Sequence, residues 1–314
     1  MNRDELHALV DQLESNICSV VLGKQDVVRL CLVALLAGEH LLLEDVPGVG
    51  KTLVGKAIAR SIQGRFCRLQ FTPDILPSDI VGSSIYQPDT HDFVFNEGPI
   101  FANVVLADEI NRAPPRTQSA LLEAMSDCQV SADGETHKLM QPFMVIATQN
   151  PYEFEGTYPL PESQLDRFLI RISIGYPDRM HERQVLQMHR QGEPVEQLQT
   201  VLDGDQVIQL QQAVREVQVD ESVSDYLLEV VEATRNSDQL HVGASTRGAL
   251  NLYSAAQAAA FLDSRDFVVP DDIKQLAAAV LAHRVIPKGY LHGTRSRETE
   301  ELIDQLVAQV SVPV

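Results

Sequence analysis

The sequence has 314 residues, of which 44% are hydrophobic and 22% are charged, which is ordinary for a globular protein and leaves room for two domains. Its formal net charge is -19, from 25 Lys and Arg against 44 Asp and Glu, and such an acidic chain disfavours non-specific binding to nucleic acid. The longest apolar run, residues 30–37, is too short to span a membrane, and the charged N-terminus is unlike a signal peptide, so we expect a cytoplasmic protein without a membrane span.

Cysteine and histidine spacing argues against several classes of site. The four cysteines, Cys18, Cys31, Cys67 and Cys128, show neither zinc nor redox spacing. The sequence also contains no H-E-x-x-H and no G-x-S-x-G, so the zinc-protease and serine-hydrolase motifs are both missing.

The first half of the chain alternates helices and strands. In chain order we expect helices at residues 1–18 and 25–36, a strand at 40–44, a helix at 52–62, strands at 65–71 and 103–106, a helix at 116–127, and strands at 143–147 and 169–174. A hairpin is expected within residues 72–99, and another within 128–142 has strands at 129–131 and 138–140 around a turn at Asp133 and Gly134. Strands that alternate with helices predict an α/β fold with a parallel sheet.

Beyond Pro177 the strand signal almost disappears. One helix is expected to begin at Pro270, with Asp271 and Asp272 in its first turn. We therefore predict an α/β domain with N-terminal helices at residues 1–177 and a helical domain at 178–314.

A glycine-rich loop joins the first strand to the third helix. In Gly48, Val49, Gly50, Lys51 and Thr52 the glycines let backbone amides surround phosphates, and the helix N-terminus adds partial positive charge. This context predicts a nucleoside triphosphate site, with Lys51 on the β- and γ-phosphates and the Thr52 hydroxyl on magnesium. The residues expected to bind ATP here are Asp45, Val46, Pro47, Gly48, Val49, Gly50, Lys51, Thr52 and Leu53.

One residue departs from the usual loop pattern. The full pattern begins with glycine, and Asp45 stands at that position. Its carboxylate either weakens the anion site or points away from it.

Two acids end the strand that follows the first hairpin. Asp108 and Glu109 come directly after four apolar residues. Phosphoryl transfer requires charge neutralisation and a positioned nucleophile, so Asp108 is expected in the magnesium shell, and Glu109 is expected to deprotonate the attacking water.

Three longer motifs carry a family resemblance. Residues 72–79, 108–113 and 156–168 resemble the MoxR group of AAA+ ATPases, in the branch with an insert in helix 2, and the likeness extends over about residues 20–290. The resemblance implies an AAA+ phosphate-loop core followed by a helical lid.

The resemblance also implies further site residues. Asn150 corresponds to sensor 1, Arg167 to an arginine finger that acts on the neighbouring subunit's ATP, and Arg247 to sensor 2 on the lid. A loop that packs on the adenine base is implied at Val21, Leu22 and Gly23.

The implied function is magnesium-dependent ATP hydrolysis by a ring, expected to be a homohexamer, that remodels or activates a partner protein in a chaperone-like way. Partners in this family often carry a von Willebrand factor A domain. Insertion of a metal ion into a partner or substrate is one form of this chaperone-like function. A nucleic-acid motor of the same branch is an alternative, but neither hairpin is rich in Lys or Arg. A low-turnover, nucleotide-dependent scaffold is another, which the presence of Glu109, Asn150 and Arg167 argues against.

Overall fold

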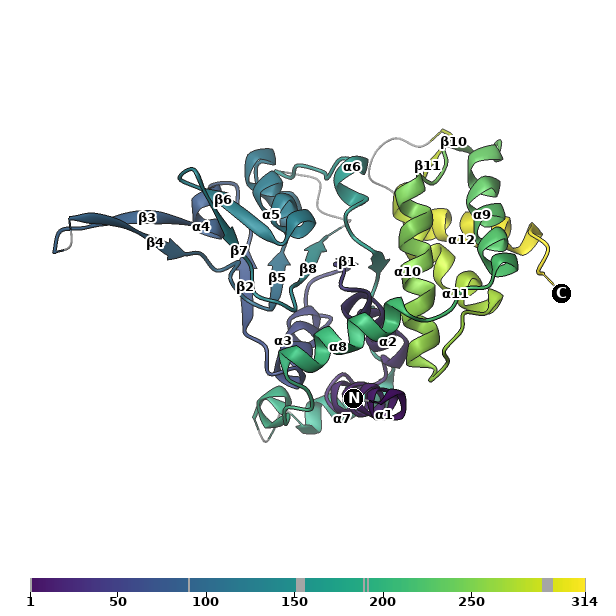
Figure 1. Ribbon diagram of the computed structural model, residues 1–314, viewed down its shortest axis with the longest axis horizontal. Coiled ribbons are helices and arrows are strands. Elements are labelled where there is room, and N and C mark those ends of the chain that lie inside the picture. Colours follow the sequence, from purple (N-terminus) through teal and green to yellow (C-terminus); the bar gives the residue numbers. More distant parts are fainter. Residues whose placement is uncertain are drawn as a thin grey trace.

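The computed structural model describes residues 2–89, 91–150, 156–188, 190, 192–289 and 296–313. A parallel sheet lies in the middle of the molecule, a long hairpin projects at one end, and a group of helices forms the other end (Figure 1). The predicted class, an α/β core followed by a helical part, is confirmed.

The central sheet has five parallel strands in the order β2, β5, β8, β1, β9. Their bounds are β1 Leu41–Glu44, β2 Phe66–Gln70, β5 Val104–Asp108, β8 Met144–Gln149 and β9 Ile170–Ile172. The register pairs Glu44 with Gln149 and Gln70 with Asp108, so the carboxyl ends of four strands lie along one edge. This edge is where open α/β sheets bind their ligands.

Apolar side chains on the strands alternate between two clusters on the two faces of the sheet. In β5, Val104 and Leu106 join one cluster, and Val105 and Ala107 join the other. The first face is covered by α1 Arg3–Cys18, α2 Gln25–Ala37 and α3 Lys51–Ser61. The second is covered by α5 Pro115–Asp127 and by residues of both hairpins. Because both faces are covered, the inner strands β1, β5 and β8 are apolar almost throughout, whereas the edge strand β2 carries the exposed residues Arg68 and Gln70.

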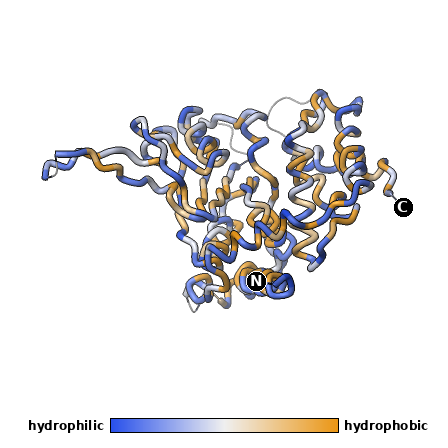
Figure 2. The backbone as a smooth tube through the Cα atoms, in the orientation of Figure 1, coloured by the Kyte–Doolittle hydropathy of each residue, from blue (hydrophilic) through white to orange (hydrophobic). Residues whose placement is uncertain are grey.

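A long hairpin, β3 Gly82–Gln87 with β4 Asp92–Glu97, follows the short helix α4 Pro77–Val81. It projects well beyond the body (Figure 1) and carries an apolar stretch beside a hydrophilic tip (Figure 2). At its base the two chains pack so closely that a Cβ on Gly82 would lie 2.2 Å from the Asn96 carbonyl oxygen. A Cβ on Gly98 would likewise lie 2.2 Å from the Ile80 carbonyl oxygen.

The second hairpin contains β6 Gln129–Ala132 and β7 Glu135–Lys138. The predicted turn at Asp133 and Gly134 is confirmed, and both residues have positive φ, 53° and 86°. The predicted position of the second strand, residues 138–140, is wrong. Because the turn has only two residues, strand pairing resumes directly after it. β7 therefore begins at Glu135 and ends at Lys138, which pairs with Gln129.

The remainder of the chain is almost wholly helical, as predicted. Its elements are α7 Arg179–Met188, η3 Pro194–Gln197, α8 Gly204–Arg215, α9 Glu221–Asn236, α10 Thr246–Leu262, α11 Pro270–Leu281, η4 Ala282–Arg284 and α12 Ser296–Gln309. Two short strands, β10 Leu240–Val242 and β11 Ile286–Pro287, pair antiparallel and were not predicted. One apolar cluster joins α1–α3 to these helices, so the boundary at Pro177 stays a prediction.

Two short elements remain: η1 Ile110–Arg112, which directly follows the acid pair, and α6 Glu162–Leu165, which contacts η4. Within the described ranges, no helix is both long and apolar enough to cross a membrane.

Candidate functional site

The glycine-rich loop leaves β1 and enters α3 at the carboxyl edge of the sheet. Gly48 and Gly50 have φ of 86° and 100°, a left-handed region that favours glycine. A Cβ at either position would meet nothing within 4 Å, so backbone conformation rather than space requires glycine there. Gly50 is the N-cap of α3, so the first amides of an 11-residue helix are available to an anion.

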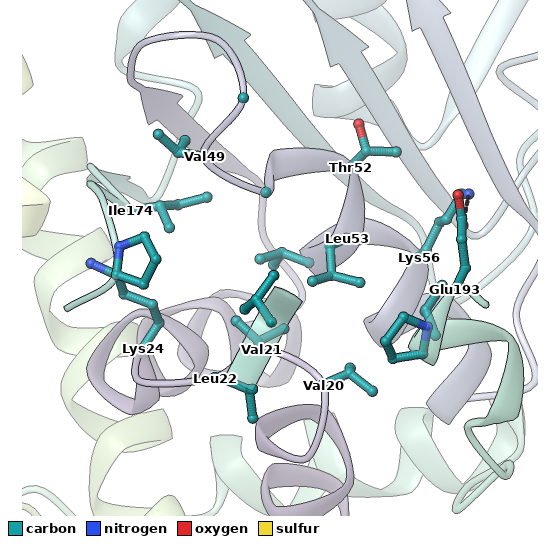
Figure 3. Close-up of a pocket in the computed structure, with 17 residues that line it drawn as sticks. Val20, Val21, Leu22, Lys24, Val49, Thr52, Leu53, Lys56, Ile174 and Glu193 are labelled. Carbon is teal, nitrogen blue, oxygen red and sulfur yellow. Dashed lines mark hydrogen bonds and ion pairs between the residues drawn. The ribbon is translucent and has the colours of Figure 1, made fainter. Parts of the chain in front are cut away.

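Lys51 and Thr52 occupy the first turn of α3. The Lys51 ammonium donates to the Asp45 carbonyl oxygen at 2.7 Å, so in this structure it lies across the start of its own loop. Thr52 lines a cavity, and its hydroxyl points away from the apolar side chains at the cavity's other end (Figure 3).

The Asp45 carboxylate points toward the chain that follows β9. It is 7% exposed and accepts hydrogen bonds from Gly175 N at 2.7 Å, Val46 N at 2.9 Å and Ser173 Oγ at 3.1 Å. Asp45 is not among the residues that line the cavity. Of the two possibilities left open by the sequence, the geometry favours the second: the carboxylate anchors the loop to the β9–α7 connection.

The cavity has a volume of about 300 Å³ and one apolar end, where Val20, Val21 and Leu22 lie below the loop (Figure 3). The predicted residues Gly48, Val49, Gly50, Thr52 and Leu53 line the same cavity. Gly23, also predicted, instead packs against the ring of His181. A polar end at a helix N-terminus and an apolar end beyond it suit a nucleotide, with phosphates at the loop and the base against the valines.

Several lining residues carry no sequence signal. They come from the chain after β9, from α7 and from η3: Ile174, Pro177, Val185, Glu193, Pro194 and Val195. At the rim, Lys56 forms an ion pair with Glu193 at 3.2 Å. Lys24, another lining residue, donates to the Tyr176 carbonyl oxygen at 2.9 Å.

The two acids lie at the end of β5, and Thr148 of β8 connects them. The buried Thr148 hydroxyl donates to Asp108 Oδ1 at 2.6 Å and accepts from Glu109 N at 2.9 Å. Glu109 has a φ of 59°, a left-handed conformation that is uncommon outside glycine. Its side chain therefore no longer follows the alternation of side chains along β5. Sequence reasoning missed Thr148, because only the pairing of β8 with β5 brings it to the acids.

Both carboxylates already have cationic or polar partners. Arg68 of β2 donates to Asp108 Oδ2 through Nε at 3.1 Å and Nη2 at 2.5 Å. Gln70 Nε2 donates to Glu109 Oε2 at 3.0 Å, and Arg112 Nε lies 3.0 Å from the same oxygen. The strand order β2, β5, β8 therefore places a guanidinium and an amide on one side of the acids and a hydroxyl on the other.

A magnesium ion fits this donor set without a protein cage. Among the described residues, no three His, Cys, Asp or Glu side chains group closely enough to hold a metal. Magnesium bound with a nucleotide takes one or two protein oxygens and completes its shell with phosphates and water. Thr52 and Asp108 are the residues that would supply those oxygens.

Of the other predicted residues, Val46, Pro47 and Lys51 of the loop are not among those that line the cavity, and neither are Asn150, Arg167 and Arg247. Asn150 directly follows β8, which lies between the loop strand β1 and the acid strand β5. Arg167 donates through Nη1 to the Leu122 carbonyl oxygen and to Ser126 Oγ, both on α5 of its own chain. Arg247 is exposed in the first turn of α10.

Comparisons with known proteins agree with this architecture. Residues 40–170 match the model of the ATPase family associated with various cellular activities (AAA), and residues 232–306 match the AAA lid domain. An uncharacterized protein of Bacillus subtilis, YeaC, is 48% identical over 99% of this chain and 97% of its own length. Chaperone MoxR1 of Mycobacterium tuberculosis is 42% identical over 90% of this chain and 76% of its own.

The chain belongs to the MoxR family of AAA+ ATPases. The crystal structure of a proposed ATPase from Cytophaga hutchinsonii has the same fold, with a TM-score of 0.90, 37% sequence identity, and coverage of 99% of this chain and 97% of that one. The predicted family and the predicted AAA+ core with a helical lid are both confirmed.

Proposed function

We propose that this MoxR-family protein hydrolyses ATP with magnesium and uses the energy to remodel or activate a partner protein. One observation carries the proposal: the phosphate loop after β1 and the acid pair after β5 lie at one edge of the sheet, separated only by β8. This arrangement supplies an anion cradle, oxygens for a metal and a candidate base in the positions that phosphoryl transfer needs.

ATP binding would exchange several contacts of the structure. The Lys51 ammonium would leave the Asp45 carbonyl oxygen, its partner at 2.7 Å, for the β- and γ-phosphates. Thr52 and Asp108 would hold magnesium, which neutralises charge on the phosphates. Because Arg68 now occupies Asp108 Oδ2, this cation would yield to the metal.

Glu109 is the candidate base for the attacking water. Its carboxylate is held by Gln70 and Arg112, so hydrolysis requires that at least one of these partners releases it. The hydrogen bond from the Glu109 backbone N–H to Thr148 Oγ1 keeps Glu109 next to the Asp108 carboxylate during this exchange. Asn150, at the end of the intervening strand, is expected to orient the same water.

The remaining groups lie outside the cavity, and one of them, Arg167, is expected to act on a neighbouring subunit. We expect a homo-oligomeric ring, a hexamer in our proposal. In it, the Arg167 side chain would give up its hydrogen bonds to α5 and reach the ATP of the adjacent subunit. Arg247 would contact the γ-phosphate from the lid. The exposed hairpins would act on the partner, expected to contain a von Willebrand factor A domain. The hairpin at residues 82–97 contains no Lys or Arg, which argues against a grip on nucleic acid.

The first test separates ATP binding from hydrolysis. Glu109→Gln keeps the shape of the side chain and removes the base, so ATP should bind as in the wild type while phosphate release falls by about 10²- to 10⁴-fold. Nucleotide titration and a phosphate-release assay measure the two effects. Lys51→Ala is the matched control and should lose binding itself. Wild-type turnover by Glu109→Gln would reject the assignment of the base.

A further inference from the structure

The guanidinium of Arg284 is buried at the junction between the helical part of the chain and the segment that carries Arg167. Arg284 lies in η4, directly after α11, and its side chain is 1% exposed. Arg167 lies between α6 and β9, more than a hundred residues earlier. The two arginines thus belong to different parts of the fold, and the contacts of Arg284 bring these parts together.

Arg284 holds the backbone on both sides of Arg167. On the N-terminal side, Nε donates to Asp166 Oδ1 at 2.8 Å and Nη2 to the Asp166 carbonyl oxygen at 3.3 Å. On the C-terminal side, Nη2 donates to the Phe168 carbonyl oxygen at 2.5 Å and Nη1 to the Leu169 carbonyl oxygen at 3.1 Å. Arg167 is the residue between these contacts.

Neighbouring groups reinforce the same junction. His283 Nε2 lies 2.9 Å from the Phe168 carbonyl oxygen. Burial lowers the pKa of Arg284 to about 10, with the Asp166 carboxylate opposing that shift, so the guanidinium stays charged near neutral pH. Its five donors in a planar fork are needed to reach carbonyls on both sides of one residue, which a lysine ammonium cannot do.

We propose that Arg284 is a positioning residue for the arginine finger, and that it ties the lid of one subunit to the finger which that subunit offers to its neighbour. The inference rests on the proposed role of Arg167 in trans. α11 packs against α10, whose first turn carries Arg247, and the Arg284 side chain lies against Gly248 of α10, so movement of Arg247 toward a nucleotide is transmitted to Arg284. Through its hydrogen bonds, that movement reaches the backbone of Arg167.

The test separates a defect in the finger from a defect in the subunit's own site. Arg284→Lys, in the full chain at assembling concentrations, should bind ATP normally and lose about 10- to 100-fold in kcat, because a finger displaced by about 1 Å forfeits that much. Mixing it with Glu109→Gln pairs an intact base with an intact finger at roughly a quarter of the interfaces of a head-to-tail ring, so activity should recover to about that fraction of the wild type.

Arg167→Ala mixed with Glu109→Gln is the reference for finger rescue. If that mixture recovers activity and the Arg284→Lys mixture does not, Arg284 acts in its own site and the inference is overturned while the proposed function stands. If neither recovers in subunits shown to co-assemble, the trans finger itself is rejected, and the inference is rejected with it.

Two further variants guard against a folding artefact. Arg265 forms a two-pronged ion pair with Asp272 at 2.6 and 2.9 Å elsewhere in the helical part, so Arg265→Lys should leave kcat unchanged. A loss of kcat in Arg265→Lys equal to that in Arg284→Lys would overturn the specific role. Should Arg284→Lys fail to fold, Asp166→Ala, which removes the carboxylate that accepts from Arg284 Nε at the half-buried end of the network, goes through the same mixtures with the same expected rescue.

Discussion

At the scale of single residues, Asp45 shows how a side chain that departs from a motif can have a structural use. A carboxylate next to a phosphate loop would repel its ligand, yet here its oxygens accept from Gly175 N, Ser173 Oγ and its own neighbour Val46. Hydrogen bonds to a charged acceptor contribute about 1.5–3 kcal/mol each. The anchor therefore stabilises both the loop and the connection that leads to α7.

Asp45→Asn should accordingly lower the melting temperature and weaken ATP binding, because the amide accepts fewer hydrogen bonds and leaves a buried donor unpaired. We expect a loss of about 1–3 kcal/mol in the free energy of unfolding. Ser173→Ala removes one donor only and should cost less. Denaturant unfolding and nucleotide titration measure both effects. Tighter ATP binding by Asp45→Asn would mean that the carboxylate acts on the phosphates through its charge.

Which site residues the sequence could predict depends on whether they share a local motif. Gly48, Lys51 and Thr52 lie within five consecutive residues where the loop enters α3, so their spacing alone was informative. Arg68 and Thr148 belong to other strands, and only the order of the sheet brings them to the acids. Nothing in their local sequence indicates this. The cavity residues of α7 and η3 escaped prediction for the same reason.

At the scale of elements, His40 joins three parts of the core. It lies just before β1, its Nδ1 accepts from Val145 N of β8 at 3.1 Å, and its Nε2 donates to the Met125 carbonyl oxygen of α5 at 2.9 Å. Burial lowers the pKa of His40 to about 4, against the hydrogen bond to Met125, which favours the charged form. The imidazole is therefore neutral in the folded protein near neutral pH.

This predicts a pH dependence of stability with a definite sign. Between pH 6.5 and about 4 the unfolded chain binds a proton at His40 and the folded chain does not, so the free energy of unfolding falls as the pH falls. From pH 7 to 5 this group should contribute a loss of about 2 kcal/mol. Denaturant unfolding at both pH values measures it.

The matched variant is His40→Gln, which keeps a donor and an acceptor and does not titrate. Its loss of stability between the two pH values should be smaller than that of the wild type by about the same 2 kcal/mol. Some dependence should remain, because burial and the charges of Arg284 and Arg171 also lower the pKa of His283. An equal loss in the wild type and His40→Gln would contradict the assignment.

The elements themselves were largely readable from the sequence, and the exceptions have physical reasons. Buried strands such as β1 form short apolar runs between breakers, and α1 shows its buried face through Leu6, Val10, Leu13 and Ile17. The second strand of the hairpin at residues 129–138 was misplaced because Leu139 and Met140 gave an apolar signal just past its end. Leu139 is buried in the core, although it lies outside the strand.

At the scale of the whole molecule, the hairpin at residues 82–97 and the C-terminal helices lie at opposite ends (Figure 1). The hairpin exposes Ile85, Tyr86, Phe93 and Val94, with Phe93 at 67%. It is braced against the second hairpin, since Ser84 N donates to Asp133 Oδ2 at 2.8 Å and Phe95 stacks on His137 at 3.8 Å. Exposed apolar side chains on a braced ribbon suit contact with a protein partner.

We expect partner capture to depend on the nucleotide. Glu109→Gln with ATP and the wild type with ADP should retain different amounts of a protein with a von Willebrand factor A domain from the native extract, as mass spectrometry would measure. A tenfold preference needs only about 1.4 kcal/mol of coupling.

A variant with serine in place of Ile85, Tyr86, Phe93 and Val94 tests whether the hairpin makes the contact with the partner. Because these side chains are exposed, the melting temperature and ATP binding should not change, while capture should be lost. Equal recovery in both nucleotide states would reject the coupling. Retention of nucleic acid alone would favour a motor that acts on nucleic acid.

The packing at the foot of the long hairpin determines how it transmits motion. At Gly82 and Gly98 the two chains approach so closely that neither position has room for a Cβ, and the base is therefore wedged against the end of α4. A ribbon fixed in this way is a cantilever. A rotation of the body too small to open the nucleotide cavity moves the free tip through a larger arc. Displacement is therefore larger at the tip of the hairpin than at the sheet, and the force delivered there is smaller.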